Sequence, residues 1–129
     1  MPDLTAKKKR PRWYNLSPLN LPVPGLVSIF HRVSGALLFA GLVWFLYLLD
    51  MSLASESGFA RFRTVVGHPV AKLALLALAW SYLHHFCAGI RYLFLDIDRG
   101  LDLGAARKSS YAVLAVSLAL TAFVGVRLW

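Results

Sequence analysis

The sequence predicts an all-α integral membrane protein built on three transmembrane helices, and three observations support this fold class. Of its 129 residues, 58% are hydrophobic and only 16% are charged. The mean hydropathy is +0.60. The charges lie mostly outside three long apolar blocks, whereas a soluble domain of this size needs a more polar surface. Since a membrane-spanning helix needs about 20 apolar residues, the blocks predict one membrane anchor at 26–128, with spans at about 26–49, 68–96 and 108–128.

Residues 1–25 are expected to form a basic tail followed by an irregular approach segment. The tail carries Lys7, Lys8, Lys9, Arg10 and Arg12. Prolines discourage a helix in this stretch, and no early apolar run suggests a cleavable signal peptide. Trp13 and Tyr14 suit the lipid headgroup region. The net charge of +8 is not arranged as a basic stripe interleaved with aromatic residues, so a nucleic-acid partner is not expected.

The first span needs a polar stretch to reach full length. Its purely apolar part, 35–49, is 15 residues long, or about 22 Å of helix, which is short of a bilayer core of roughly 30 Å. Extension back through 28–35 supplies the missing turns. Ser28, His31, Arg32 and Gly35 then share roughly one helical face. A polar stripe at this depth is expected to face the protein or a cavity rather than lipid.

The connections between the spans carry no recognisable motif. Residues 50–64 are expected to be a short loop, and His68 is expected to lie at the membrane boundary rather than to bind a ligand. Residues 97–108 form the second linker. The third span carries small residues that allow close helix contact, namely Ala112, Ala115, Ser117, Ala119, Ala122 and Gly125.

The distribution of Lys and Arg predicts how the three spans are oriented. The side that holds the N-terminus and the second linker carries the five basic tail residues with Arg99, Arg107 and Lys108. The opposite side carries Arg61, Arg63 and Arg127. Because basic residues remain on the cytoplasmic side, the N-terminus is expected in the cytoplasm.

The second span contains two histidines in a stretch of 18 residues without formal charge, Leu73 to Ile90. Ionisable residues inside a span are usually functional, and a neutral imidazole is a good ligand for iron. His84 and His85 point about 100° apart, and Gly89 lies one turn beyond His85. This spacing favours His85 as the ligand of a haem iron, with His31 and Arg32 at similar depth to meet the propionates. The alternative is that a histidine simply bonds a neighbouring helix.

Two motifs resemble the cytochrome b membrane-anchor subunit of succinate dehydrogenase. They are S-I-F-H-R-V-S-G at 28–35 and H-F-C-A-G-I-R at 85–91, followed by Asp96. The resemblance covers nearly the whole chain. One departure is Tyr92, where some relatives have histidine.

The resemblance implies a specific set of cofactors and partners. His85 would be one axial ligand of haem b, and the other would come from a second small hydrophobic anchor subunit. His31 and Arg32 would approach the haem propionates, and Ser28 and Arg32 would line the ubiquinone site. A flavoprotein would oxidise succinate and an iron–sulfur subunit would deliver the electrons. The location would be a bacterial inner membrane, with the N-terminus cytoplasmic and the C-terminus periplasmic.

The chain itself is not expected to be an enzyme. It has no sequence resembling a flavin site, an iron–sulfur cysteine set or a dicarboxylate site. Two alternatives remain: an anchor of a fumarate reductase or another quinone oxidoreductase, and a purely structural small membrane subunit. The absorption spectrum of the complex separates the haem-binding readings from the structural one.

Overall fold

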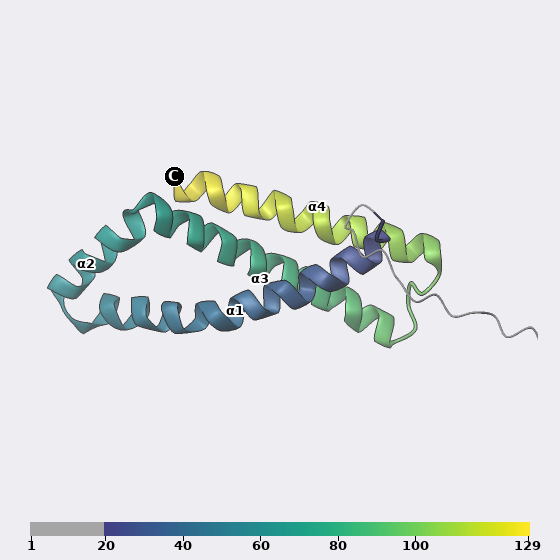
Figure 1. The fold of residues 1–129 in the computed structure, drawn as a ribbon, viewed down its shortest axis with the longest axis horizontal. Coiled ribbons are helices and arrows are strands. Elements are labelled where there is room, and N and C mark those ends of the chain that lie inside the picture. Colours follow the sequence, from purple (N-terminus) through teal and green to yellow (C-terminus); the bar gives the residue numbers. More distant parts are fainter. Residues whose placement is uncertain (1–19) are drawn as a thin grey trace, which may run out of the picture.

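The computed structural model describes residues 20–129, which form four helices and no strand (Figure 1). The helices are α1 (Val23–Ala54), α2 (Glu56–Gly67), α3 (Pro69–Asp96) and α4 (Leu103–Leu128). Within this part of the chain, α1, α3 and α4 are long and apolar enough to cross a membrane. The predicted all-α membrane fold with three spans is therefore confirmed. The basic tail with Trp13 and Tyr14 lies outside the described residues.

Helix α1 is longer than the predicted span at both ends. It begins at Val23, inside the segment expected to be irregular, because Pro24 lies in the first turn, where proline costs no backbone hydrogen bond. It continues past residue 49 to Ala54. Ser28, His31 and Arg32 consequently lie well inside a continuous helix.

The prediction of a loop at 50–64 is wrong, because α2 occupies most of this segment. Ser55 caps this helix by accepting a hydrogen bond from the Gly58 backbone N–H at 3.0 Å. Glu56 lies in the first turn, where a negative charge is favourable. In Figure 1, α2 crosses obliquely between the end of α1 and the start of α3.

Helix α3 matches the predicted second span closely, and both its ends have identifiable caps. His68 is the N-cap residue, and its Nδ1 accepts from the Val70 N–H at 3.3 Å. At the other end, Asp98 has a φ of 58°. The Asp98 N–H donates to the Leu95 carbonyl and the Arg99 N–H to the Phe94 carbonyl, both at 3.0 Å. This is the Schellman pattern of helix termination.

Helix α4 begins before the predicted residue 108. Asp102 caps it through Oδ2, which accepts from the Ala105 N–H at 2.9 Å. Of the small residues expected to form contacts, Ser117 is buried and Gly125 lies beside Leu76, but the four alanines Ala112, Ala115, Ala119 and Ala122 are exposed. The small residues therefore do not form one packing face.

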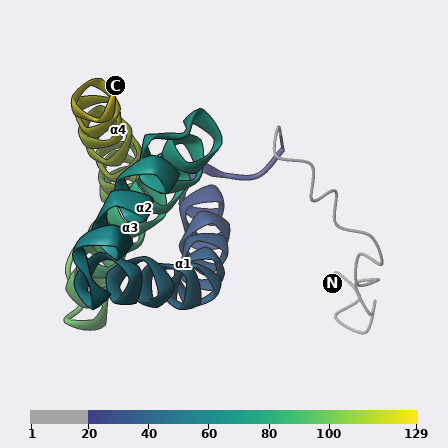
Figure 2. The same cartoon turned by 90° about the vertical axis from the view of Figure 1, so that its left-hand side faces the viewer.

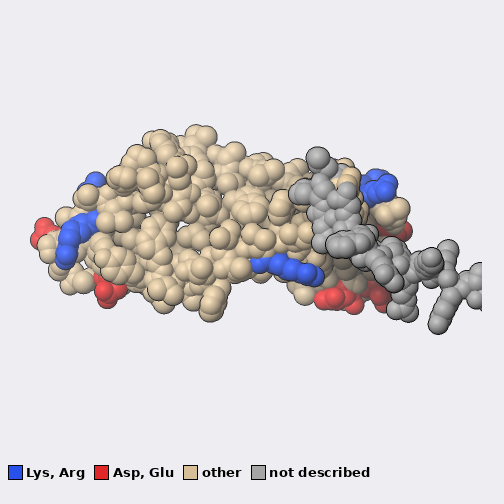
Figure 3. Space-filling view, viewed as in Figure 1, with Lys and Arg blue, Asp and Glu red and all other residues tan. Residues whose placement is uncertain are grey.

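The three long helices pack with α3 contacting both α1 and α4, as the view along the bundle from the α2 end illustrates (Figure 2). The buried core is small and includes Val27, Ala88 and Val113. Large apolar side chains cover the outside, as expected where lipid replaces water. On the face seen in Figure 3, charged side chains gather toward the two ends, with a broad uncharged band between them.

Candidate functional site

The two helices α1 and α3 bring His31 and His85 together. Their rings are stacked, with centroids 4.0 Å apart and planes 10° from parallel. Both side chains are half-buried. The edge of Tyr92 packs against the His31 ring, with centroids 5.1 Å apart. The two sequence motifs thus meet at one place in the bundle.

Hydrogen bonding to the His85 ring determines where its proton lies. Nδ1 of His85 is 3.0 Å from the His31 carbonyl oxygen. A carbonyl oxygen can only accept, so Nδ1 carries the hydrogen and donates it. In a neutral ring, Nε2 then has a free lone pair, which is the arrangement found when a histidine binds a metal through Nε2. Among the described residues, all hydrogen bonds to this ring reach Nδ1.

Ser34 supports the same arrangement, although it was not among the site residues predicted from the sequence. Its hydroxyl donates to the His31 carbonyl oxygen at 2.9 Å. Its oxygen also lies 3.3 Å from His85 Nδ1. Because the hydroxyl hydrogen is already used, the oxygen faces Nδ1 as an acceptor. Ser34 is fully buried, and its spacing of three from His31 was the available signal.

Gly35, rather than Gly89, makes the closest approach to the His85 ring. A Cβ atom at position 35 would lie 3.0 Å from His85 Cε1, which is tighter than ordinary contact. At position 89 the nearest atom, His31 Nε2, would be 4.0 Å away. The absence of a side chain at Gly35 therefore lets the His85 ring lie against α1.

His84 occupies a different environment, in the core between α1, α3 and α4. It is fully buried. Its ring stacks on Trp80 with centroids 5.3 Å apart and meets the edge of Phe30 at 5.8 Å. Nδ1 lies 3.5 Å from the Ser117 hydroxyl oxygen, whereas Nε2 is buried and has no hydrogen-bond partner within residues 20–129. Core side chains therefore enclose this ring.

Ser28 and Arg32 lie one turn apart on α1, on either side of His31 in the sequence. Ser28 is half-buried and Arg32 is exposed on the chain. The shared polar face predicted for 28–35 is thus divided: His31, Ser34 and Gly35 contact α3, whereas Arg32 is exposed.

Arg91, the last residue of the second motif, is largely buried. Its Nε donates to the Ser109 hydroxyl oxygen at 2.9 Å, and one terminal nitrogen lies 3.5 Å from the Ala106 carbonyl oxygen. The signal in the sequence was its spacing of seven from His84, which places both on one helical face.

A family model and individual relatives of known name point to the same protein family. The sequence model described as "Succinate dehydrogenase/Fumarate reductase transmembrane subunit" matches residues 6–124. The succinate dehydrogenase cytochrome b556 subunit of Paracoccus denitrificans is 34% identical over 111 residues, covering 86% of this chain and 85% of the relative. That of Coxiella burnetii is 33% identical over 122 residues, covering 94% and 98%. The mitochondrial cytochrome b560 subunit of Bos taurus is 30% identical, covering 88% and 76%.

Proposed function

Because the chain belongs to the family of succinate dehydrogenase and fumarate reductase transmembrane subunits, we propose that it is the cytochrome b anchor of a succinate dehydrogenase. The names of its curated relatives favour this enzyme over fumarate reductase. Its partners are a flavoprotein, an iron–sulfur subunit, a second small hydrophobic anchor subunit and the lipid bilayer. The chain alone does not oxidise succinate; its role is to hold cofactor and quinone where electrons leave the soluble subunits.

His85 is the residue of this chain that binds the haem b iron in our proposal. The observation that carries this assignment is the His31 carbonyl oxygen 3.0 Å from Nδ1, which leaves Nε2 as the ligating nitrogen. The half-buried position of His85 allows a flat cofactor to reach it, whereas His84 is enclosed in the core. The bound haem supplies one-electron transfer, and the partner anchor supplies the second axial ligand.

The polar residues of α1 serve the groups around the iron ligand. His31, stacked on His85, and Arg32 are proposed to bond the haem propionates, since arginine and carboxylate form strong charge-assisted hydrogen bonds. Ser28 and Arg32 are proposed to line the ubiquinone site. Reduction places negative charge on the quinone oxygens, which a hydroxyl donor and a fixed positive charge stabilise.

The membrane is proposed to be the bacterial inner membrane, with the N-terminus cytoplasmic and the C-terminus periplasmic. The eight basic residues assigned to the N-terminal side and the three on the other side support this orientation. An alkaline phosphatase fused after Trp129 is expected to be active, since it requires export. An inactive but well-expressed fusion contradicts the orientation.

The absorption spectrum of the purified complex tests whether this chain is a haem-binding anchor. Reduction with dithionite is expected to give the bands of a low-spin b-type haem in stoichiometric amount with this chain. A complex that contains all its subunits, oxidises succinate and lacks these bands is evidence for the purely structural reading.

Two activities measured on the same assembled complex test the quinone site. Ser28→Ala is expected to slow quinone reduction about two- to tenfold, corresponding to one hydrogen bond of about 0.5–1.5 kcal/mol. Arg32→Leu is expected to slow it more, because a charge is lost. Succinate oxidation with a water-soluble acceptor remains unchanged in both.

Ser52→Ala and Arg61→Leu are matched controls for these two variants. Ser52 lies at the opposite end of α1 and bonds the Leu49 carbonyl, while Arg61 lies in α2. Both controls are expected to reduce quinone normally. If Ser28→Ala and Arg32→Leu behave like the controls, the quinone site lies elsewhere.

A further inference from the structure

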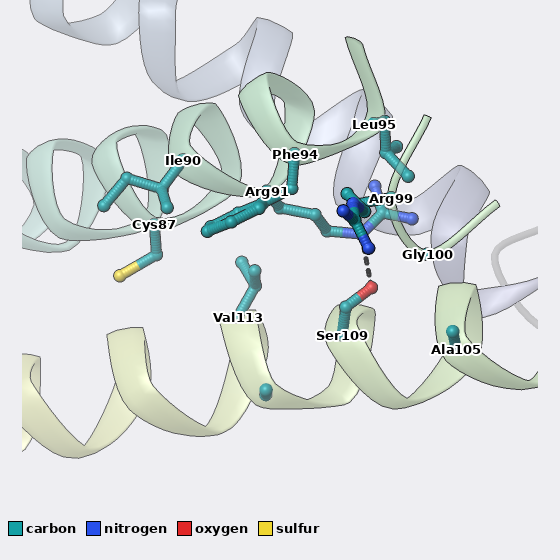
Figure 4. A pocket seen from close by; sticks show the side chains of 11 residues that line it. Cys87, Ile90, Arg91, Phe94, Leu95, Arg99, Gly100, Ala105, Ser109 and Val113 are labelled. Carbon is teal, nitrogen blue, oxygen red and sulfur yellow. Dashed lines mark hydrogen bonds between the residues drawn. The ribbon is translucent and has the colours of Figure 1, made fainter. Parts of the chain in front are cut away.

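A groove of about 370 Å³ lies between the end of α3 and the start of α4 (Figure 4). One wall is apolar and includes Ile90 and Phe94 of α3 and Val113 of α4. Ile90 and Phe94 are 41% and 57% exposed, so the groove opens on the outer, lipid-facing side of the helices. The groove lies on the face of α3 away from the stacked His31–His85 pair, which packs against α1.

Of the described residues, two arginines and no acidic residue line the polar end of the groove. Arg91 and Arg99 both line it. Arg91 is only 7% exposed, and Figure 4 shows its guanidinium directed at Ser109 across the groove. Its bonds within residues 20–129 go to the neutral oxygens of Ser109 and Ala106, not to a carboxylate. A buried guanidinium without an opposite charge is unfavourable, so this end of the groove favours an anion.

The two arginines of the groove are held in different ways. The Ser109 hydroxyl, 2.9 Å from Nε, orients Arg91 from α4. Arg99 sits at the mouth, on the turn that ends α3, where its N–H bonds the Phe94 carbonyl at 3.0 Å. Its side chain is exposed. Arg91 is thus held inside the groove by hydrogen bonds, whereas Arg99 presents an exposed side chain at its mouth.

We propose that this groove binds one acidic phospholipid, with its phosphate on Arg91 and Arg99 and an acyl chain along Ile90, Phe94 and Val113. The guanidinium fork matches phosphate geometry, and basic pockets between transmembrane helices recognise anionic headgroups. The apolar wall distinguishes a lipid from free phosphate, because only a lipid uses both ends of the groove. Arg91 also lies over the Tyr92 ring, 5.5 Å from its centroid, and Tyr92 in turn meets His31. The groove therefore adjoins the residues proposed to hold the haem, but none of them lines it.

Native mass spectrometry of the whole purified complex tests this proposal. The complex is delipidated, incubated in phosphatidylcholine nanodiscs with or without phosphatidylglycerol, and the retained lipids are counted. We expect the parent to retain one phosphatidylglycerol in preference to phosphatidylcholine. Arg99→Gln is expected to lower this retention about fivefold, the effect of one basic residue near an anionic headgroup. Arg91→Gln is expected to lower it further.

Two more variants separate the parts of the site. Arg107→Gln removes an exposed charge from the first turns of α4, outside the groove, and is expected to retain lipid like the parent. Ala112→Phe fills the apolar wall without changing charge and is expected to lower retention, whereas a free-phosphate site would be unaffected. Arg99→Gln keeps the test decisive if Arg91→Gln fails to assemble, because Arg99 is exposed.

Several results overturn the proposal. In the first, Arg99→Gln and assembled Arg91→Gln complexes retain as much phosphatidylglycerol as Arg107→Gln. In the second, the parent retains no phosphatidylglycerol or does not prefer it to phosphatidylcholine. In the third, millimolar inorganic phosphate displaces the retained lipid, which identifies a free-phosphate site. Subunit composition, read from the same spectra, confirms that each variant is assembled.

Discussion

His84 and His85 are adjacent in the sequence and belong to two different regions of the molecule. The His84 ring lies in the core, against Trp80 and Phe30, with Ser117 of α4 near its Nδ1. The His85 ring lies half-buried against α1, with the His31 carbonyl at its Nδ1. An oxygen atom lies near Nδ1 of each ring, so the two rings differ mainly in what surrounds Nε2.

This difference shows that access, rather than residue type, separates the two imidazoles. A rotation of about 100° per residue directs one ring into the three-helix core and the other toward α1. Packing of His84 among aromatic rings is one of the contacts that fix the rotation of α3 about its axis. That rotation in turn places His85 beside His31 and Gly35. His84 is therefore expected to position His85, the proposed ligand, without itself binding the cofactor.

The largest expected effect comes from removing each imidazole in turn. His85→Ala is expected to abolish the low-spin b-type spectrum of the assembled complex, because the axial nitrogen is lost. His84→Ala is expected to leave it largely intact. Reduced-minus-oxidised absorbance spectra, normalised to subunit content, measure both.

His84→Gln guards against a packing defect in the His84→Ala complex, since it keeps a polar side chain in the core. The comparison fails if the spectrum is lost in the assembled His84 variants and preserved in His85→Ala. In that case the core histidine is the ligand and the structure must open to admit the haem.

The haem site proposed at His85 is expected to be incomplete without the second anchor subunit. Since His85 is the one axial ligand proposed for this chain, expression of this polypeptide alone is expected to give little bis-imidazole haem, and co-expression with the proposed second anchor is expected to restore it. Optical and electron paramagnetic resonance spectra of the purified chain measure the coordination. A normal six-coordinate spectrum from the chain alone, as monomer or homodimer, contradicts the shared site.

Gly35→Ala tests the close contact between α1 and the His85 ring. An added Cβ would lie 3.0 Å from Cε1, so the ring must shift. If the strain on the ring differs between the oxidised and reduced haem by about 0.5–1.5 kcal/mol, the haem midpoint potential is expected to move by about 20–65 mV for a one-electron couple. Potentiometric titration measures the shift.

Gly89→Ala is the matched control for Gly35→Ala. Its added Cβ would meet His31 Nε2 only at 4.0 Å, so the potential is expected to change less. Equal shifts in the two variants, or a larger one at Gly89, would contradict the assignment of the tighter contact to Gly35.

The smallest expected effect distinguishes the serines beside the two histidines. Ser34→Ala removes a hydroxyl 3.3 Å from His85 Nδ1, while Ser117→Ala removes one 3.5 Å from His84 Nδ1. The His31 carbonyl still accepts from His85, so Ser34→Ala is expected to shift the potential by only about 20 mV, the lower end for one hydrogen bond. Ser117→Ala is expected to produce no shift. A shift confined to Ser117→Ala reverses the assignment of the two regions.

Local patterns in the sequence predicted the spans well and the connections poorly. Apolar block length predicted α1, α3 and α4, because hydrogen bonding within each helix is obligatory in lipid. The predicted ends differ from the observed ones where two N-cap residues were not used in the prediction. These residues are Ser55, before α2, and Asp102, before α4. Both N-cap residues can be read from the sequence, so α2 could have been predicted from it.

The sequence by itself determined that His31 and His85 lie at similar depth, because spacing along a helix converts directly to distance along the membrane normal. It could not determine which atoms face each other across helices. The stacked rings, the His31 carbonyl at His85 Nδ1 and the close approach at Gly35 depend on how α1 rotates against α3. The burial of Arg91 against Ser109 depends likewise on how α4 packs. Rotation and packing are decided by the fit of side chains from all three helices at once, which only the tertiary structure contains.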